Sequence, residues 1–117
     1  MKEFMYIFRR DLVNEQAFDR LSPEQMQEEL KVWNVWMNNL AEKGKLVGGQ
    51  PLFAHGKVVN GKSKIIDGPY IEGKDIVGGY LLVKANDINE ALDLSKGCPL
   101  LSTEDGSVEV REIMPAH

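Results

Sequence analysis

Alternating and helically spaced apolar residues along the chain predict its main secondary-structure elements. Residues 3–9 are rich in aromatic and β-branched side chains, and they form a first predicted strand that is apolar on both faces. Further strands are predicted at residues 46–50 and 77–85, and the second of these is again apolar on both faces. In a final predicted strand at residues 107–113, apolar and charged residues alternate, so one of its faces is expected to meet water.

A first helix is predicted from its capping residues. Ser22 and Pro23 begin it, and Gln25 completes a capping box with Ser22. Gly44 is a natural cap for its C-terminal end. One apolar stripe follows the helical spacing of this segment and consists of Met26, Leu30, Trp33, Met37 and Leu40.

A second, shorter helix is predicted in the C-terminal half of the chain. Asp87 is its N-terminal cap, and Glu90 completes a capping box. Gly97 stops this helix after about Lys96.

Two connecting segments have patterns of their own. Asn60-Gly61 lies between strand-like residues and predicts a β-hairpin with arms at 57–59 and 62–66. Residues 11–21 form a polar connection with scattered apolar side chains. That connection is long enough to hold a short helical turn or to act as a flap.

The predicted elements follow the order strand, helix, two or three strands, helix, strand. This order indicates the α+β class, with a split β-α-β arrangement in which an antiparallel sheet carries two helices on one face. A chain of 117 residues suits one domain, residues 1–117.

Composition and charge narrow the classes of function. The chain is 43% apolar and 27% charged, as in globular proteins, and its net charge of -4 argues against binding to nucleic acid or to anionic membranes. Residues 1–10 are expected to form a strand rather than a signal peptide, and no apolar run approaches the roughly 18 residues that span a bilayer. Cys98 is the single cysteine and allows no intrachain disulfide, so we expect a cytoplasmic protein.

The strongest candidate chemistry lies where an apolar strand runs into Asp67-Gly68-Pro69, a sequence with strong turn propensity. Burial of Asp67 at the end of that strand would suit its carboxyl group to proton transfer. The simpler interpretation is that the Asp67 side chain only caps the turn. Gly78 and Gly79, which begin the next apolar strand, indicate close backbone approach or a bulge.

Four further side chains are candidates for the same site. His55 can exchange a proton near neutral pH, so Asp67 and His55 are the predicted catalytic residues. Tyr70 can stack on a ligand, while Lys74 and Arg9 can hold an anionic one. Each also has a structural interpretation, as a loop histidine, a packed ring or solvated charges. We expect a pocket lined by Asp67, Tyr70 and Lys74 with His55 nearby, and neither a metal nor an organic cofactor, because zinc and calcium ligand spacings are absent.

Several of these pieces, taken together, resemble the YCII-related family, in the branch named for an Asp-Gly-Pro-Phe (DGPF) motif. The resemblance rests on order and spacing and covers most of the chain. Tyr70 stands where the motif usually has Phe, and Gly73 stands where family members often carry Thr. The matching pieces are Ser22-Pro23-Glu24, Leu46-Val47-Gly48-Gly49, Asp67-Gly68-Pro69-Tyr70, Lys74, Gly78-Gly79-Tyr80 and Gly106-Ser107-Val108-Glu109-Val110.

The resemblance implies a ferredoxin-like unit that pairs into a dimeric α+β barrel. In related isomerase and YCII proteins an acid–base pair of Asp and His has been proposed at the barrel cleft, which implies such a role for Asp67. We therefore expect a cofactor-independent enzyme that performs acid–base chemistry, isomerisation or elimination, on a small organic acid or lactone. The alternatives are a non-catalytic small-molecule-binding or accessory protein, and a structural dimer whose loop only ends strands.

The predicted strands also indicate an oligomer. Segments 3–9, 57–66 and 80–83 carry apolar residues on both faces, although two helices can cover only one face of the sheet. A bare apolar face would exceed the few hundred Å² that a monomer usually exposes. We expect a homodimer built through the helix-free face of the sheet.

Overall fold

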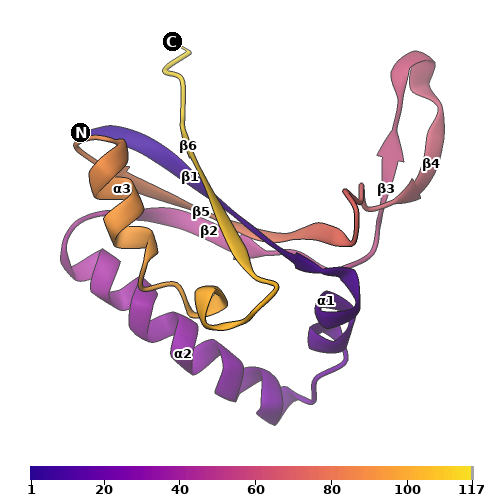
Figure 1. Ribbon diagram of the computed structural model, residues 1–117, viewed down its shortest axis with the longest axis horizontal. Helices are drawn as coiled ribbons and strands as arrows, with labels where there is room; N and C mark the ends of the chain where they lie inside the picture. Colours follow the sequence, from indigo (N-terminus) through magenta and orange to yellow (C-terminus); the bar gives the residue numbers. More distant parts are fainter. Residues whose placement is uncertain (117) are drawn as a thin grey trace.

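The computed structural model describes residues 1–116 and confirms the predicted α+β fold (Figure 1). One antiparallel sheet has the strand order β2-β5-β1-β6. Two helices connect its strands as in the ferredoxin-like split β-α-β arrangement. The strands are β1 (Lys2–Asp11), β2 (Leu46–Pro51), β5 (Asp75–Ala85) and β6 (Ser107–Glu112), and the connecting helices are α2 (Pro23–Glu42) and α3 (Ile88–Ser95).

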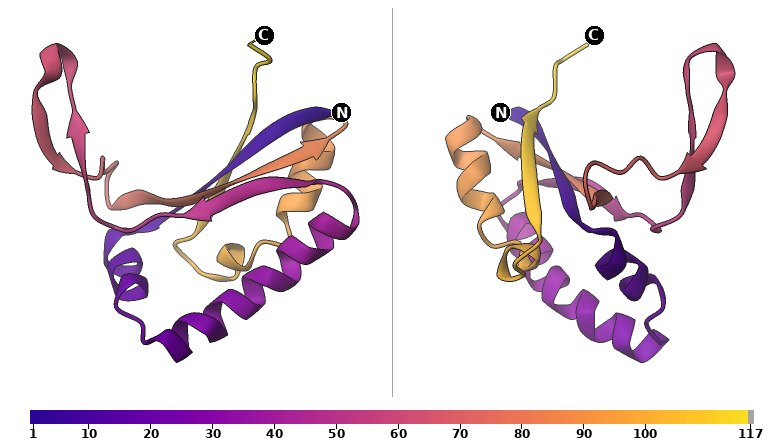
Figure 2. Two further views of the ribbon diagram at one scale, coloured as in Figure 1. Left: turned by 180° about the vertical axis from the view of Figure 1, so that it is seen from behind. Right: turned by 45° about the vertical axis from the view of Figure 1, so that its right-hand side comes forward.

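All the α-helices of the described residues lie on one face of the sheet, and the other face carries none (Figures 1 and 2). The third of them, α1 (Leu12–Asp19), lies in the connection at residues 11–21, for which the sequence allowed a short helical turn or a flap. It forms because the Asp11 side chain accepts a hydrogen bond from the backbone N–H of Val13 and so caps its first turn.

The hydrophobic core lies between the sheet and helices α2 and α3. Tyr6 of β1 is fully buried, and its ring stacks on Trp36 of α2 with 5.9 Å between ring centroids. Burial raises the pKa of Tyr6 well above its ordinary value, so its hydroxyl stays protonated and donates to the Ala91 carbonyl of α3. Trp36 Nε1 donates to the Leu94 carbonyl at 3.0 Å. These two side chains therefore hold both helices to the sheet.

The capping predictions hold at the first long helix. Ser22 Oγ accepts from the N–H of Gln25 at 3.2 Å, Gln25 Oε1 accepts from the N–H of Ser22 at 3.0 Å, and Gly44 follows the helix with φ of 71°. At α3, Asp87 caps the N–H of Glu90 as predicted. The reciprocal half of that predicted capping box is wrong, because the Glu90 carboxylate accepts from the N–H of Asn86 instead.

The predicted hairpin exists, but its predicted two-residue turn is wrong. Strands β3 (Gly56–Val59) and β4 (Ile65–Gly68) pair only with each other, with Val59 opposite Ile65, so five residues connect them. This wider loop includes the short 3-10 turn Gly61–Ser63, and Lys62 and Ser63 rather than Asn60 adopt positive φ. A second short 3-10 helix spans Pro99–Ser102.

No helix in the described part of the chain combines the length and the apolar character that crossing a membrane requires.

The buried Tyr6 hydroxyl gives a first prediction. Tyr6→Phe removes the buried hydrogen bond that joins β1 to the Ala91 carbonyl of α3, so the free energy of unfolding should fall by about 1 kcal/mol. Urea denaturation followed by tryptophan fluorescence measures this change. Tyr70→Phe is the matched control, because Tyr70 is 76% exposed, and an equal loss in both variants would contradict the assigned role of Tyr6.

Candidate functional site

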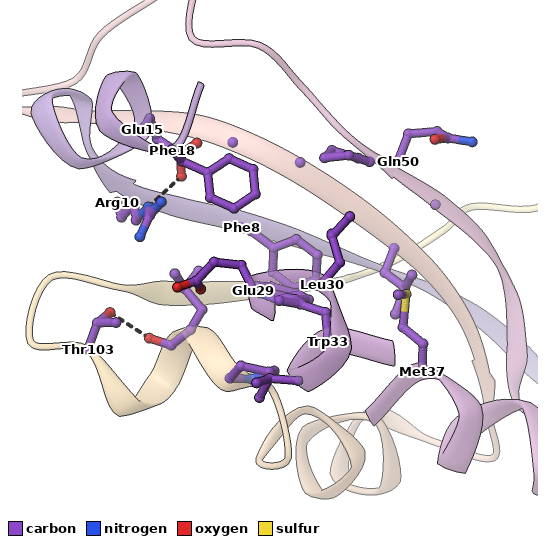
Figure 3. A pocket seen from close by; sticks show the side chains of 18 of the residues that line it. Phe8, Arg10, Glu15, Phe18, Glu29, Leu30, Trp33, Met37, Gln50 and Thr103 are labelled. Carbon is purple, nitrogen blue, oxygen red and sulfur yellow. Dashed lines mark hydrogen bonds and ion pairs between the residues drawn. The ribbon is translucent and has the colours of Figure 1, made fainter. Parts of the chain in front are cut away.

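A cavity of about 460 Å³ lies between α1, α2 and the helix-covered face of the sheet (Figure 3). Its walls are mainly apolar and include Phe8 of β1, Phe18 of α1 and Trp33 of α2. The 3-10 helix Pro99–Ser102 closes part of its boundary. This volume is in the range of small-molecule sites, which are typically apolar with a few placed polar groups.

The main charged feature of this cavity is an ion pair between α1 and β1. Arg10 Nε donates to Glu15 Oε1 at 2.7 Å, and the two side chains are only 19% and 10% exposed (Figure 3). Arg10 also donates to the Asn14 carbonyl at 3.3 Å and lies over the Phe18 ring, 5.8 Å from its centroid. Within the described residues Glu15 Oε2 has no hydrogen-bond partner, so it is available to a ligand in the cavity.

A bulge in the sheet makes room for the Glu15 carboxylate. Phe8 pairs with Gly79 and the next residue of β1, Arg9, pairs with Val77, which leaves Gly78 as the extra residue of β5. A Cβ on Gly78 would overlap the carboxylate of Glu15. The predicted bulge at the Gly-Gly pair is therefore confirmed, and its absent side chain is what admits a buried carboxylate.

Helix α1 is held at both ends, and this fixes the direction of Glu15. Asp105, in the loop before β6, accepts from the N–H of Asp11 at 3.1 Å and from Asn14 Nδ2 at 2.8 Å. The hydrogen bond from Asn14 is the main reason that the pKa of Asp105 lies below its usual range. At the other end, Asp19 accepts from the N–H of Ala54 at 2.7 Å.

Asp67, the leading candidate from the sequence, lies on the β3–β4 hairpin. Its side chain is 96% exposed and forms an ion pair with Lys57 on the neighbouring strand at 2.9 Å. The expectation that Asp67 is buried at the end of its strand is wrong, because β4 has no layer of side chains packed over it.

The other candidates from the sequence are also outside the cavity. His55 is exposed and stacks on Phe53 with 5.1 Å between ring centroids, and Tyr70 and Lys74 are exposed. Arg9 pairs with Glu109 of β6 at 3.4 Å. The described part of a single chain does not gather these residues around a cavity, and their role in a site stays a prediction.

Sequence reasoning missed Glu15, the most buried ionisable carboxylate of the described residues. Two signals pointed towards it. Glu15 lies only five residues after Arg10, a residue of opposite charge. The Gly78-Gly79 pair indicated a strand with space beside it. Neither signal shows that the two segments meet.

The remaining reactive groups do not form a site. Cys98 is buried, and burial raises the pKa of its thiol to about 11, which makes it a poor nucleophile near neutral pH. Across the described residues there is no cluster of three or more His, Cys, Asp or Glu side chains suited to holding a metal ion.

The ion pair yields a second prediction. Arg10→Met leaves the Glu15 carboxylate buried without its partner, which should lower the free energy of unfolding by about 1–3 kcal/mol at pH 7.

Urea unfolding of the unmodified protein and of the variant at pH 7 measures that effect. Arg10→Lys keeps the positive charge and should recover part of the stability. Lys31→Met is the control for an exposed pair, since Lys31 and Glu28 are 70% and 73% exposed, and it should change the stability by less than about 0.5 kcal/mol. An Arg10→Met loss no larger than that of Lys31→Met would contradict the assigned pair.

The chain has detectable similarity to one protein family and to a solved structure. No curated protein sequence matches the chain. A solved structure of 5-chloro-2-hydroxyhydroquinone dehydrochlorinase from Burkholderia phenoliruptrix AC1100, in complex with 2,5-dihydroxybenzoquinone, is 16% identical, with 95% of this chain and 93% of that chain covered and a TM-score of 0.45. A likeness of this degree carries no argument about function. The family profile of the YCII-related domain matches residues 5–117, and the chain therefore belongs to the YCII-related family.

Proposed function

We propose that this protein binds a small organic acid or lactone in the cavity beside α2 and that Glu15 performs acid–base chemistry on it. The observation that carries this proposal is a buried carboxylate in the wall of an otherwise mainly apolar cavity. Burying a charged group costs stability, and binding sites are typically apolar cavities with a few placed polar groups.

The lining of the cavity indicates the kind of ligand. Phe8, Phe18 and Trp33 offer aromatic surfaces to a flat apolar body. The Arg10–Glu15 pair at the wall offers one cationic and one anionic group, which orient a ligand that carries a carbonyl or carboxylate. A flat molecule with one polar end satisfies both features.

The proposed chemistry uses the free oxygen of Glu15. Glu15 Oε2 accepts a proton from the carbon next to a carbonyl, and the Arg10 guanidinium stabilises the negative charge that develops on the ligand. Return of the proton to a different carbon completes an isomerisation. Departure of an anionic leaving group with the electron pair instead completes an elimination.

The second candidate is a binding or accessory protein that uses the same cavity without turnover. The 2.7 Å ion pair favours it, because one oxygen of Glu15 is already engaged by Arg10 as a fixed pair that can orient a ligand. Binding is common to both candidates, while only the first requires the Glu15 carboxylate to change its protonation state.

Ligand binding is tested first, by titrating the protein with a panel of small aromatic acids, phenols and lactones while tryptophan fluorescence is recorded. A ligand in the cavity contacts Trp33 and should change its emission. Leu30→Trp narrows the cavity and should weaken binding by about tenfold or more, since overpacked sites resist occupation. Val35→Trp on the same helix is the matched control, because Val35 is 72% exposed and outside the cavity. Equal binding by both variants would contradict the assignment of the site.

Catalysis is tested next on any ligand that is turned over. Glu15→Gln keeps the shape of the side chain but removes the base, so kcat should fall by about 10²–10⁴ while binding persists. Asp67→Asn examines the residue predicted from the sequence. A loss of kcat in Asp67→Asn with full activity in Glu15→Gln would contradict the proposal, and binding by both without any turnover would favour the accessory role.

A further inference from the structure

The charged groups that line the cavity have an excess of negative charge. They are one arginine, Arg10, and two glutamates, Glu15 and Glu29, so the formal charge of the lining is -1. Glu15 is buried, whereas Glu29 is exposed. The chain as a whole carries -4, so its field acts in the same direction. A ligand therefore enters a negative environment, although an arginine stands in the wall.

The positive charge of Arg10 is already used within the protein. Its Nε donates to Glu15 Oε1 at 2.7 Å, and its Nη2 donates to the Asn14 carbonyl at 3.3 Å (Figure 3). Arg10 also acts on Asp105, whose pKa is lowered mainly by the hydrogen bond from Asn14 and further by the Arg10 charge. Within the described residues only one of the three guanidinium nitrogens, Nη1, has no hydrogen-bond partner.

The atoms left for a ligand fit an uncharged carbonyl group better than a carboxylate. A carbonyl oxygen needs a single donor, which Nη1 of Arg10 supplies. Bidentate recognition of a carboxylate uses two guanidinium nitrogens as a parallel fork, and Nε and Nη2 are occupied. A carboxylate would also bring a second negative charge beside Glu15 Oε2, between mainly apolar walls where water screens charges weakly.

We propose that the cavity selects uncharged carbonyl compounds, such as ketones, esters and lactones, over carboxylates of the same shape. This inference rests on the proposed function and narrows its ligand to the uncharged members of that class. The carbonyl oxygen of the ligand accepts from Arg10, and a C–H group on the adjacent carbon faces Glu15 Oε2. The aromatic body of the ligand lies against Phe8, Phe18 and Trp33.

The same arrangement keeps the charge of the site constant during proton transfer. The C–H bond breaks, its proton goes to Glu15 Oε2, and its electron pair stays on the ligand as an enolate. One negative charge thereby moves from Glu15 to the ligand oxygen, beside Arg10. A ligand that arrives already charged would instead add to the negative charge of the site throughout.

A matched pair of probes tests this selection without any substitution. The probes are 2-acetylnaphthalene and 2-naphthoate, which differ in that a methyl group replaces one carboxylate oxygen. In isothermal titration calorimetry at pH 7 and low ionic strength, the unmodified protein should bind the ketone at least about tenfold more tightly than the carboxylate, because only the carboxylate meets Glu15 with a like charge.

Glu15→Gln tests the origin of the selection. It removes the buried negative charge and keeps an oxygen for Arg10, so it should tighten the binding of 2-naphthoate by about tenfold or more and leave that of the ketone within about threefold. Glu28→Gln is the matched control, because it removes an equal charge from α2 at a side chain that is 73% exposed and outside the cavity. It should change the binding of neither probe.

Leu30→Trp separates this inference from the proposed function, because it narrows the cavity. Ketone binding that Leu30→Trp leaves unchanged would place the ligand outside the cavity and overturn both. If Leu30→Trp weakens binding, equal affinity of the unmodified protein for the two probes, or a Glu15→Gln variant that gains no affinity for 2-naphthoate, would overturn only the selection by charge. Failure of the unmodified protein to bind either probe would overturn it as well.

Discussion

A four-stranded sheet has two faces, and the helices of residues 1–116 cover only one of them. On the covered face, Tyr6 and Trp36 hold helices α2 and α3 against the sheet and are buried in the hydrophobic core. Where α1 meets the bulged end of the sheet, the packing is looser and leaves the cavity. The helix-free face and the hairpin of residues 56–68 follow from the same constraint, because no helix of the described residues packs over either of them.

The bulge at Gly78 connects the fold to its chemistry. It lets the Glu15 carboxylate enter the wall of the cavity, where Arg10 compensates its charge. The same end of the sheet leads into the β3–β4 hairpin, since Pro51 and Gly79 line the cavity and the N–H of Leu52 donates to the Gly78 carbonyl at 2.9 Å. The cavity and the hairpin of residues 56–68 therefore lie at the same end of the sheet.

The parts of the fold that local signals specify could be predicted from the sequence. Ser22 and Gln25 cap α2 through contacts three residues apart, and the aromatic and β-branched residues of β1 mark it as a strand without knowledge of any partner. The loop between β3 and β4 could not be predicted. Val59 pairs with Ile65, so this loop is longer than the two-residue turn that Asn60-Gly61 favours.

The site depends on contacts that no local pattern contains. Glu15 is buried because Gly78, 63 residues later in the chain, has no side chain, and because α1 is tied down by Asp105 from near the C-terminus. Asp67 has the local signature of a functional turn, yet its surroundings in the described chain are solvent and Lys57. A turn motif indicates backbone geometry, whereas burial of a charge is decided by the whole fold.

A crystal structure of the protein grown with the tightest-binding aromatic acid or lactone tests the central claim most directly. The account predicts ligand density between Phe8, Phe18 and Trp33, with a polar atom within hydrogen-bond reach of Glu15 Oε2 or Arg10. Density beside Asp67 with the cavity closed by its own side chains would contradict it.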